Sequence, residues 1–166
     1  MCQTEGGSSI PSTTSAPEPT TTPEPTTTQR TPRPNNCPDG LIHWQEFDGE
    51  CYNLFWSSHY YVTWYEAAEL CNGLNATLTS VHSRREEDFL NDILYYNVPY
   101  LLGGMISNDG DLFWRGDGSE VDYEHYSSTG VKPGECLYQD VKDIGKGWRS
   151  TSCDKSQHIA FICKLK

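Results

Sequence analysis

The sequence predicts a single α+β domain that follows an extended N-terminal segment. Three observations predict it: the composition changes after residue 36, two stretches with helical periodicity precede several short strand-like runs, and six cysteines lie in the second part. A chain of 166 residues has room for one folded domain of ordinary size. We therefore expect a disordered segment at residues 1–36 and a folded domain at residues 37–166.

The N-terminal segment is dominated by three residue types. From Ser8 to Pro34, 20 of 27 residues are Ser, Thr or Pro, and none is aromatic, so this segment cannot bury a core. The hexapeptide Pro-Glu-Pro-Thr-Thr-Thr occurs twice in succession from Pro17 to Thr28. This composition is typical of O-glycosylated, mucin-like stalks, and an unmodified flexible linker is the alternative.

The start of the domain predicts a hairpin and then a helix. In CPDGLIHWQEFDGEC, apolar and polar residues alternate around Asp48-Gly49, a pair suited to a two-residue turn between strands. Thr63 and Glu66 have the spacing of a capping box, and apolar residues then recur at helical spacing. We expect a helix from Trp64 to Asn72.

A second helix and several strands complete the predicted elements. Ser83 and Glu86 again have the spacing of a capping box, which predicts a helix from Arg84 to Leu94. After Tyr100 the helical periodicity stops. Short runs of apolar residues separated by Gly, Asp, Asn and Ser then predict antiparallel strands.

The cysteines indicate a disulfide framework. The chain has seven cysteines and no C-x-x-C pair, so disulfides are favoured over metal knuckles. Disulfides persist in oxidising compartments, which predicts a secreted or extracellular protein. Asn75-Ala76-Thr77 is the one N-glycosylation motif. Cys2 lies outside the domain, and three interpretations stay open: it links two chains in a dimer, it joins another partner, or it is foreign to the natural protein.

No targeting or membrane segment is visible. The N-terminus shows neither the basic start nor the apolar stretch of a signal peptide. No run of about 18 apolar residues occurs, so we expect no membrane span in this sequence.

The chain is acidic, with a formal net charge of −11. From Cys37 onward there are 20 Asp or Glu and 10 Lys or Arg, so the domain carries −10. Nucleic acids and anionic membranes are poor partners for such a surface. Six acidic residues within a short stretch either hold a calcium ion in a loop or form a solvated face: Asp109, Asp111, Asp117, Glu120, Asp122 and Glu124.

An enzyme is not expected. Catalysis needs a nucleophile or acid with a partner base, and no motif in the sequence marks one. The sequence lacks G-x-S-x-G, H-E-x-x-H, a P-loop and a dinucleotide-binding fingerprint.

The order of the motifs resembles the C-type lectin-like domain family in its long form, with an extra N-terminal hairpin. The resemblance rests on CPDG, CY, TWYEAAELC, LLGG, DGS, GW and FICK in this order, and it covers Cys37 to Lys164. It implies a compact double-loop fold with two helices and small antiparallel sheets. It also implies three disulfides, which pair Cys37 with Cys51, Cys71 with Cys163, and Cys136 with Cys153.

The resemblance places the ligand site in an irregular upper loop from about Asp117 to Cys153. Sugar-binding members hold calcium there through a Glu-Pro-Asn or Gln-Pro-Asp triplet and a Trp-Asn-Asp triplet. This sequence has Lys132-Pro133-Gly134 and Trp148-Arg149-Ser150 at those places, so the oxygen ligands that calcium requires are missing. We therefore expect no metal at this site and no cofactor, and a calcium ion elsewhere in the upper loop remains an alternative.

The predicted function is recognition of an extracellular ligand. We expect this loop to bind a glycan or glycoprotein without calcium, with Lys132 and Arg149 attracting an acidic group and Trp148, if exposed, stacking on a sugar. The alternative for the two cations is that they point into water or pair with Glu135, Asp140 or Asp143. Two alternatives remain: a protein–protein module of receptor or immune-modulating type, and a structural component of mucus or matrix. The residues expected to contact the ligand are Lys132, Pro133, Glu135, Trp148, Arg149, Ser150 and Tyr126.

Overall fold

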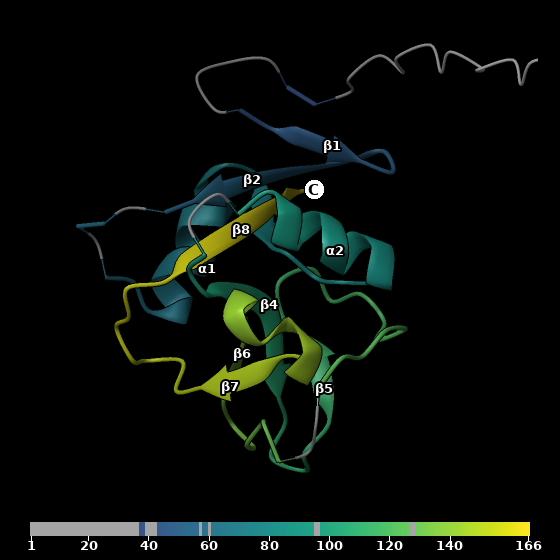
Figure 1. Cartoon of the computed structure of the whole chain (residues 1–166). Helices are drawn as coiled ribbons and strands as arrows, with labels where there is room; N and C mark the ends of the chain where they lie inside the picture. Colours follow the sequence, from purple (N-terminus) through teal and green to yellow (C-terminus); the bar gives the residue numbers. More distant parts are fainter. Residues whose placement is uncertain (1–36, 39–42, 57, 60, 95–96, 127–128) are drawn as a thin grey trace, which may run out of the picture. The chain divides into compact units, whose positions relative to one another are not determined.

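The computed structural model describes residues 37–38, 43–56, 58–59, 61–94, 97–126 and 129–166 (Figure 1). The chain divides into two units, Met1–Arg33 and Pro34–Lys166, and all the described residues belong to the second. The predicted stalk therefore lies outside the described residues. Among the residues described, no helix is long and apolar enough to cross a membrane.

The N-terminal hairpin forms as predicted. Strands β1 (Gln45–Phe47) and β2 (Glu50–Phe55) pair in antiparallel fashion, and Phe47 lies opposite Glu50. The two turn residues have positive φ angles, 50° at Asp48 and 93° at Gly49. Two-residue hairpin turns need this backbone conformation because it matches the twist of the flanking strands, and Asp-Gly is a sequence that adopts it readily.

Helix α1 (Trp64–Gly73) confirms the first predicted helix, and its capping box is complete. The Thr63 hydroxyl accepts a hydrogen bond from the Glu66 backbone N–H (3.2 Å), and Glu66 Oε2 accepts one from the Thr63 backbone N–H (2.8 Å). These bonds satisfy two of the amide groups that a helix start leaves without partners. The buried side of α1 carries Trp64, Ala67 and Cys71, as the periodicity predicted.

Helix α2 (Arg84–Asp92) confirms the second helix but not its complete capping box. Ser83 Oγ accepts a hydrogen bond from the Glu86 backbone N–H (3.1 Å), as expected. The Glu86 carboxylate does not return to Ser83, because it accepts from the His82 backbone N–H (2.7 Å) and from the Tyr52 hydroxyl. The helix is two residues shorter than predicted, since Ile93 forms its C-cap.

The strands form one sheet in which the N-terminal hairpin meets the C-terminal strand. The order is β1-β2-β8-β4-β6-β7, with β3 paired to β8 and β5 to β4. Strands β4 and β8 are parallel, so the sheet is mixed, and the prediction of small antiparallel sheets is wrong on this point. The remaining strands are β3 (Ala76–Leu78), β4 (Tyr100–Ile106), β5 (Leu112–Trp114), β6 (Cys136–Gln139), β7 (Arg149–Thr151) and β8 (Ala160–Leu165).

A short 3₁₀ helix, η1 (Val141–Lys146), was missed by the sequence reading. The Asp140 side chain accepts a hydrogen bond from the Lys142 backbone N–H (3.0 Å) and so caps its start. The helix lies between β6 and β7, inside the predicted upper loop (Figure 1). It brings Asp143 and Lys146 close to the residues expected to bind a ligand.

The three disulfides pair as the family resemblance implied: Cys37 with Cys51, Cys71 with Cys163, and Cys136 with Cys153. The predicted α+β fold of C-type lectin-like type is confirmed in its elements and its disulfides. The disulfide that spans the most residues, Cys71–Cys163, joins α1 to β8, and both of its cysteines are fully buried.

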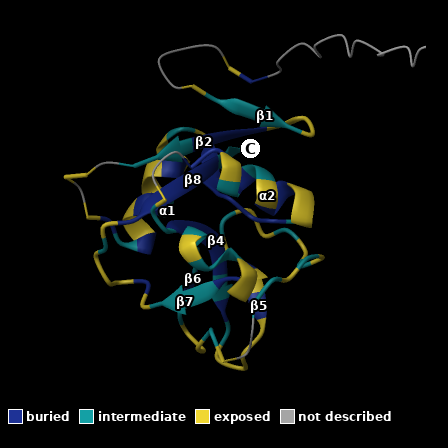
Figure 2. Ribbon diagram, in the orientation of Figure 1, coloured by how far each residue is buried: buried dark blue, intermediate teal, exposed yellow. Residues whose placement is uncertain are grey.

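The core consists of two groups of buried side chains. One lies around α1 and the disulfides, and the other around α2, β4 and two tryptophans, Trp114 and Trp148. Figure 2 shows that the central strands are buried while the loops beyond β7 and β5 are mostly exposed. The LLGG run of β4 has a packing reason, since a Cβ at Gly103 would lie 2.3 Å from the Leu78 carbonyl oxygen.

Candidate functional site

The two triplets of the predicted ligand site lie side by side in the structure. The Lys132 backbone N–H donates to Ser150 Oγ (2.8 Å), and Ser150 Oγ donates to Glu135 Oε2 (2.6 Å). The side-chain oxygen of Ser150 and one oxygen of Glu135 are therefore already engaged with each other. Gly134, with φ of +76°, turns the chain between Pro133 and Glu135.

Trp148 does not have the predicted role. Its side chain is fully buried, so it cannot stack on a sugar. It lies edge-on to Trp114 and Tyr123, with ring centroids 5.5 and 5.7 Å away, and its Nε1 donates to Glu87 Oε1 (3.0 Å). The sequence cannot distinguish a tryptophan that faces a ligand from one that packs beneath the loop, and here it packs beneath.

Arg149 is held by an acidic residue of η1. Its Nη2 lies 3.0 Å from Asp143 Oδ2, and Lys146 Nζ lies 3.1 Å from the same oxygen. The Arg149 side chain is about one third exposed, at 34%. The guanidinium is thus partly neutralised within the domain, which for Arg149 is the alternative outcome of pairing with Asp143. Lys132 and Arg149 therefore do not form a pair of unengaged cations.

Lys132 and Pro133 are exposed, and Tyr126 is half-buried. Within the described part of the chain the Lys132 ammonium has no ion pair or hydrogen bond, which leaves it open to a ligand. The Lys132–Pro133 peptide bond is trans. Tyr126 forms an isolated β-bridge with Trp148, and burial raises the pKa of its hydroxyl.

A buried carboxylate beneath the loop was missed by sequence reasoning. Glu87, on α2, is fully buried and lies close to three groups of the upper loop. It accepts hydrogen bonds from Trp148 Nε1 (3.0 Å) and the Tyr123 hydroxyl (2.7 Å), and His125 Nδ1 lies 2.7 Å from Oε1. A buried carboxylate is tolerated only when its oxygens are paired in this way. Glu87 therefore fixes the loop from below and touches no exposed surface.

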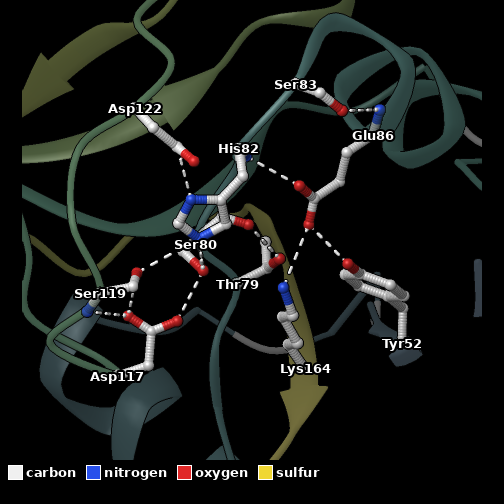
Figure 3. A network of polar contacts seen from close by, with 10 residues as sticks. All are labelled: Tyr52, Thr79, Ser80, His82, Ser83, Glu86, Asp117, Ser119, Asp122 and Lys164. Atoms are coloured by element: carbon white, nitrogen blue, oxygen red, sulfur yellow. Dashed lines mark hydrogen bonds and ion pairs between the residues drawn. The ribbon is translucent and has the colours of Figure 1, made fainter. Parts of the chain in front are cut away.

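A second polar network ties the start of the upper loop to the segment before α2 (Figure 3). His82 Nδ1 lies 2.7 Å from Asp122 Oδ1, and its Nε2 lies 2.9 Å from Ser80 Oγ and 3.2 Å from Ser119 Oγ. Both serine hydroxyls also donate to Asp117, at 2.6 and 2.7 Å. Figure 3 shows the His82 imidazole between the carboxylates of Asp122 and Asp117.

In this network Ser80, His82 and Asp122 are joined by successive hydrogen bonds, as in a catalytic triad, but the arrangement lacks the features of a hydrolase site. Ser80 is buried at 1% exposure, and its hydroxyl donates to Asp117, so it does not face an approaching substrate. Partial burial by itself raises the pKa of Asp117, yet hydrogen bonds from Ser80 and Ser119 lower it overall. A carboxylate that stays ionised and accepts from two hydroxyls is suited to holding a loop.

The acidic residues of the upper loop do not gather into an evident metal centre. Across the described ranges, no group of three or more His, Cys, Asp or Glu side chains is arranged to hold a metal ion. Asp117 and Asp122 are each engaged in the His82 network, and the hydrogen bond to His82 lowers the pKa of Asp122. These two acids serve the loop's own structure.

Two further sites were predicted from the sequence, a glycosylation site at Asn75 and a link to another chain or partner through Cys2. Asn75 is exposed just after α1, with φ of 57°, and its glycosylation stays a prediction. Cys2, predicted to link two chains or to join a partner, lies outside the described residues.

The tyrosines predict how stability depends on alkaline pH. Burial, together with bonding to Glu87, raises the pKa of Tyr123 to about 12, and burial also raises the pKa of Tyr52 and Tyr100. A raised folded pKa favours the protonated form, so this stabilisation is complete below about pH 10, the pKa of an unfolded tyrosine, and is lost above it. We expect the free energy of unfolding to fall between pH 10 and 12 in denaturant titrations.

The substitution Tyr123→Phe provides the control, because it removes one of the three groups. Its free energy of unfolding should fall less steeply above pH 10 than that of the parent. Equal free energies of unfolding at pH 9 and pH 11 in the parent would contradict this prediction. Tyrosinate absorbance measured in the same samples identifies the groups that ionise before unfolding.

The chain is similar in sequence to known lectin domains. The family model described as Lectin C-type domain matches residues 60–165. Lectin BRA-3 of Megabalanus rosa is 28% identical over 134 residues, which cover 78% of this chain and 78% of that protein.

Solved structures agree with this match. The Ca2+-dependent type II antifreeze protein in its Ca2+-free form is 27% identical with a TM-score of 0.63, and the alignment covers 74% of this chain and 97% of that one. A calcium-independent type II antifreeze protein is also 27% identical, with a TM-score of 0.62, over 77% of this chain and 92% of that one. The similar structures thus include one antifreeze protein that depends on calcium and one that does not.

Proposed function

The chain belongs to the C-type lectin domain family, and we propose that it is an extracellular, non-enzymatic recognition module that binds a glycan or glycoprotein without calcium. Binding in this proposal takes place on the upper loop and involves Lys132, Pro133 and the half-buried Tyr126. The three disulfides favour a secreted or extracellular location, since such bonds persist in oxidising compartments.

The observation that carries this proposal is the state of the two triplets. Calcium takes six to eight oxygen ligands. The only side-chain oxygen in the triplets is Ser150 Oγ, and it is bonded to Glu135. A lysine and an arginine replace expected ligands, and the exposed Lys132 ammonium repels a divalent ion, whereas the Arg149 charge is partly neutralised by Asp143. The triplets themselves therefore offer neither the oxygen ligands nor the negative charge that favour calcium, which supports a calcium-independent mode.

Lys132 gives the loop a preference for acidic ligands in this proposal. Its ammonium is exposed, whereas Arg149 is shared with Asp143. Sulfate, sialate and uronate groups on glycans offer charged oxygens that accept hydrogen bonds from such an ammonium. A domain with a charge of −10, from 20 acidic and 10 basic residues, otherwise repels these groups. Trp148 has no part in this mode, because it is buried.

The test is a glycan array probed with the protein in calcium and in chelator. We expect the same glycans to bind in both conditions, with sulfated or sialylated glycans among them. Lys132→Ala should weaken binding about tenfold, because a charge-assisted hydrogen bond contributes roughly 1.5–3 kcal/mol. Calorimetry with millimolar calcium should show no binding event at this loop.

Lys155→Ala is the matched control, since Lys155 is also exposed but lies outside the two triplets. It should leave binding unchanged. Binding that requires calcium, or that is equally weakened by the two substitutions, would contradict the proposed site. No binding to any glycan would shift the function to recognition of a protein.

A further inference from the structure

A second surface of the domain, away from the upper loop, has the character of a binding groove. It lies between α1 and the ends of β2 and β8, and its volume is about 870 Å³. Phe55, Trp56 and Phe161 contribute aromatic rings to it, and the rings of Phe55 and Phe161 stack at 5.2 Å. Leu70 and Tyr61 complete the walls. We call this surface the α1 groove.

Two large apolar side chains of the α1 groove are exposed to solvent. Tyr61 is 67% exposed and Leu70 is 56% exposed, the two highest values among the large apolar residues described as exposed. Figure 2 shows α1 with buried and exposed faces alternating along it. Neither Tyr61 nor Leu70 belongs to the two groups of buried core residues or packs against them, although the Tyr61 ring lies 5.6 Å from that of His158. Contiguous exposed apolar surface of this kind marks an interaction site.

The charge at the rim restricts the partner. Glu66 and Glu69 line the groove, and none of the described lining residues is Lys or Arg. Glu66 is committed to the cap of α1, where it bonds to Thr63. Glu69 is exposed and has no ion pair or hydrogen bond with any described residue. Its carboxylate is therefore available to a cation on a partner.

Other occupants fit this surface less well. A second copy of the domain brings the same carboxylates and another charge of −10, from 20 acidic and 10 basic residues. Anionic membranes and nucleic acids are repelled in the same way. A glycan needs several polar groups that fix its hydroxyls, whereas this groove is lined mainly by carbon atoms.

We propose that the α1 groove binds a short peptide segment of a partner protein, in which large apolar residues are flanked by Lys or Arg. The apolar residues pack on Tyr61, Leu70 and the aromatic floor, and the cation pairs with Glu69. From Glu66 to Leu74 the groove follows α1 for about 12 Å, at 1.5 Å per residue. An extended segment of about four residues spans that length. This surface acts independently of the upper loop.

The experiment is selection of a random ten-residue peptide library displayed on phage against the whole protein. We expect enriched peptides that combine apolar residues with Lys or Arg. Synthetic copies of the enriched peptides should bind Leu70→Asp at least tenfold more weakly than the parent. Glu69→Gln should weaken binding severalfold and reduce its dependence on salt, because the ion pair is lost.

Tyr65→Asp is the matched control, since Tyr65 is on the same helix and exposed at 42% but does not line the α1 groove. It should bind the peptides as the parent does, and circular dichroism checks that each variant is folded. The proposal is overturned if no peptide is enriched, if the enriched peptides are acidic, or if Leu70→Asp binds them unchanged. A dimer in light scattering that Leu70→Asp abolishes would assign the groove to a second copy instead.

Discussion

Glu87→Ala should destabilise the domain by about 3–5 kcal/mol, the usual cost of removing one partner from a buried charged network. The Glu87 side chain is fully buried and bonds to Trp148, Tyr123 and His125. Without it, the Trp148 indole N–H is left in the core with no acceptor, and a buried donor without a partner costs roughly 1–3 kcal/mol by itself. The measurement is denaturant unfolding followed by tryptophan fluorescence.

Glu87→Gln separates charge from shape in this experiment. The amide keeps one oxygen for Trp148 but turns an NH₂ group toward the other donors, so we expect a loss between those of the parent and Glu87→Ala. Glu120→Ala is the matched control, because Glu120 is exposed in the same loop and makes no ion pair or hydrogen bond with the described residues. A Glu87→Ala protein as stable as Glu120→Ala would show that Glu87 does not support the loop.

The sequence predicted the elements well because local signals agreed with the final structure. Thr63 and Glu66 cap α1, and Asp48-Gly49 forms the hairpin turn, each through contacts between residues close in sequence. The parallel pairing of β4 with β8 could not be read in this way. It joins Tyr100 to Ala160, and no short-range pattern records such a contact.

The juxtaposition of the two triplets was predicted, whereas most contacts of their side chains were not. The two triplets meet, as the family resemblance implied, yet Trp148 is buried and Arg149 pairs with Asp143. Each outcome depends on a partner in another element. Glu87 lies on α2, far from Trp148 in sequence, and Asp143 lies in η1, a helix that was not predicted. One feature of the sequence could have indicated that Glu87 is buried. The apolar residues of α2 are too few to fill its buried face, which in the structure carries Glu86, Glu87 and Leu90.

Two surfaces with different chemistry emerge from this arrangement. The upper loop presents Lys132 above a network in which Glu87 and Asp143 hold the neighbouring side chains. The α1 groove presents carbon atoms and the carboxylate of Glu69. The two proposals have opposite charge preferences, since acidic groups are proposed for the loop and basic ones for the groove. A single glycoprotein with an acidic glycan and a basic peptide segment satisfies both.

Removing the Cys71–Cys163 disulfide should have the largest effect on stability among the changes considered. The bridge spans 92 residues, and in the chain-entropy model closing a loop of that length contributes roughly 4–5 kcal/mol. It joins α1 to the central strand β8, where Cys163 lies between Asn53 of β2 and Leu78 of β3. The total stability of such a domain is about 5–15 kcal/mol, so the double variant Cys71→Ala with Cys163→Ala should lose about a quarter of it or more.

The control for this variant is Cys37→Ala with Cys51→Ala, which opens a bridge across only 14 residues. The same model gives about 3 kcal/mol for that bridge, and the hairpin keeps its strand pairing with β8 without it. Denaturant unfolding of both variants, with mass spectrometry to verify the remaining disulfides, compares the two losses. If the Cys71 and Cys163 variant loses no more stability than the hairpin variant, then packing of α1 on β8 holds the double loop, and the long bridge adds little to it.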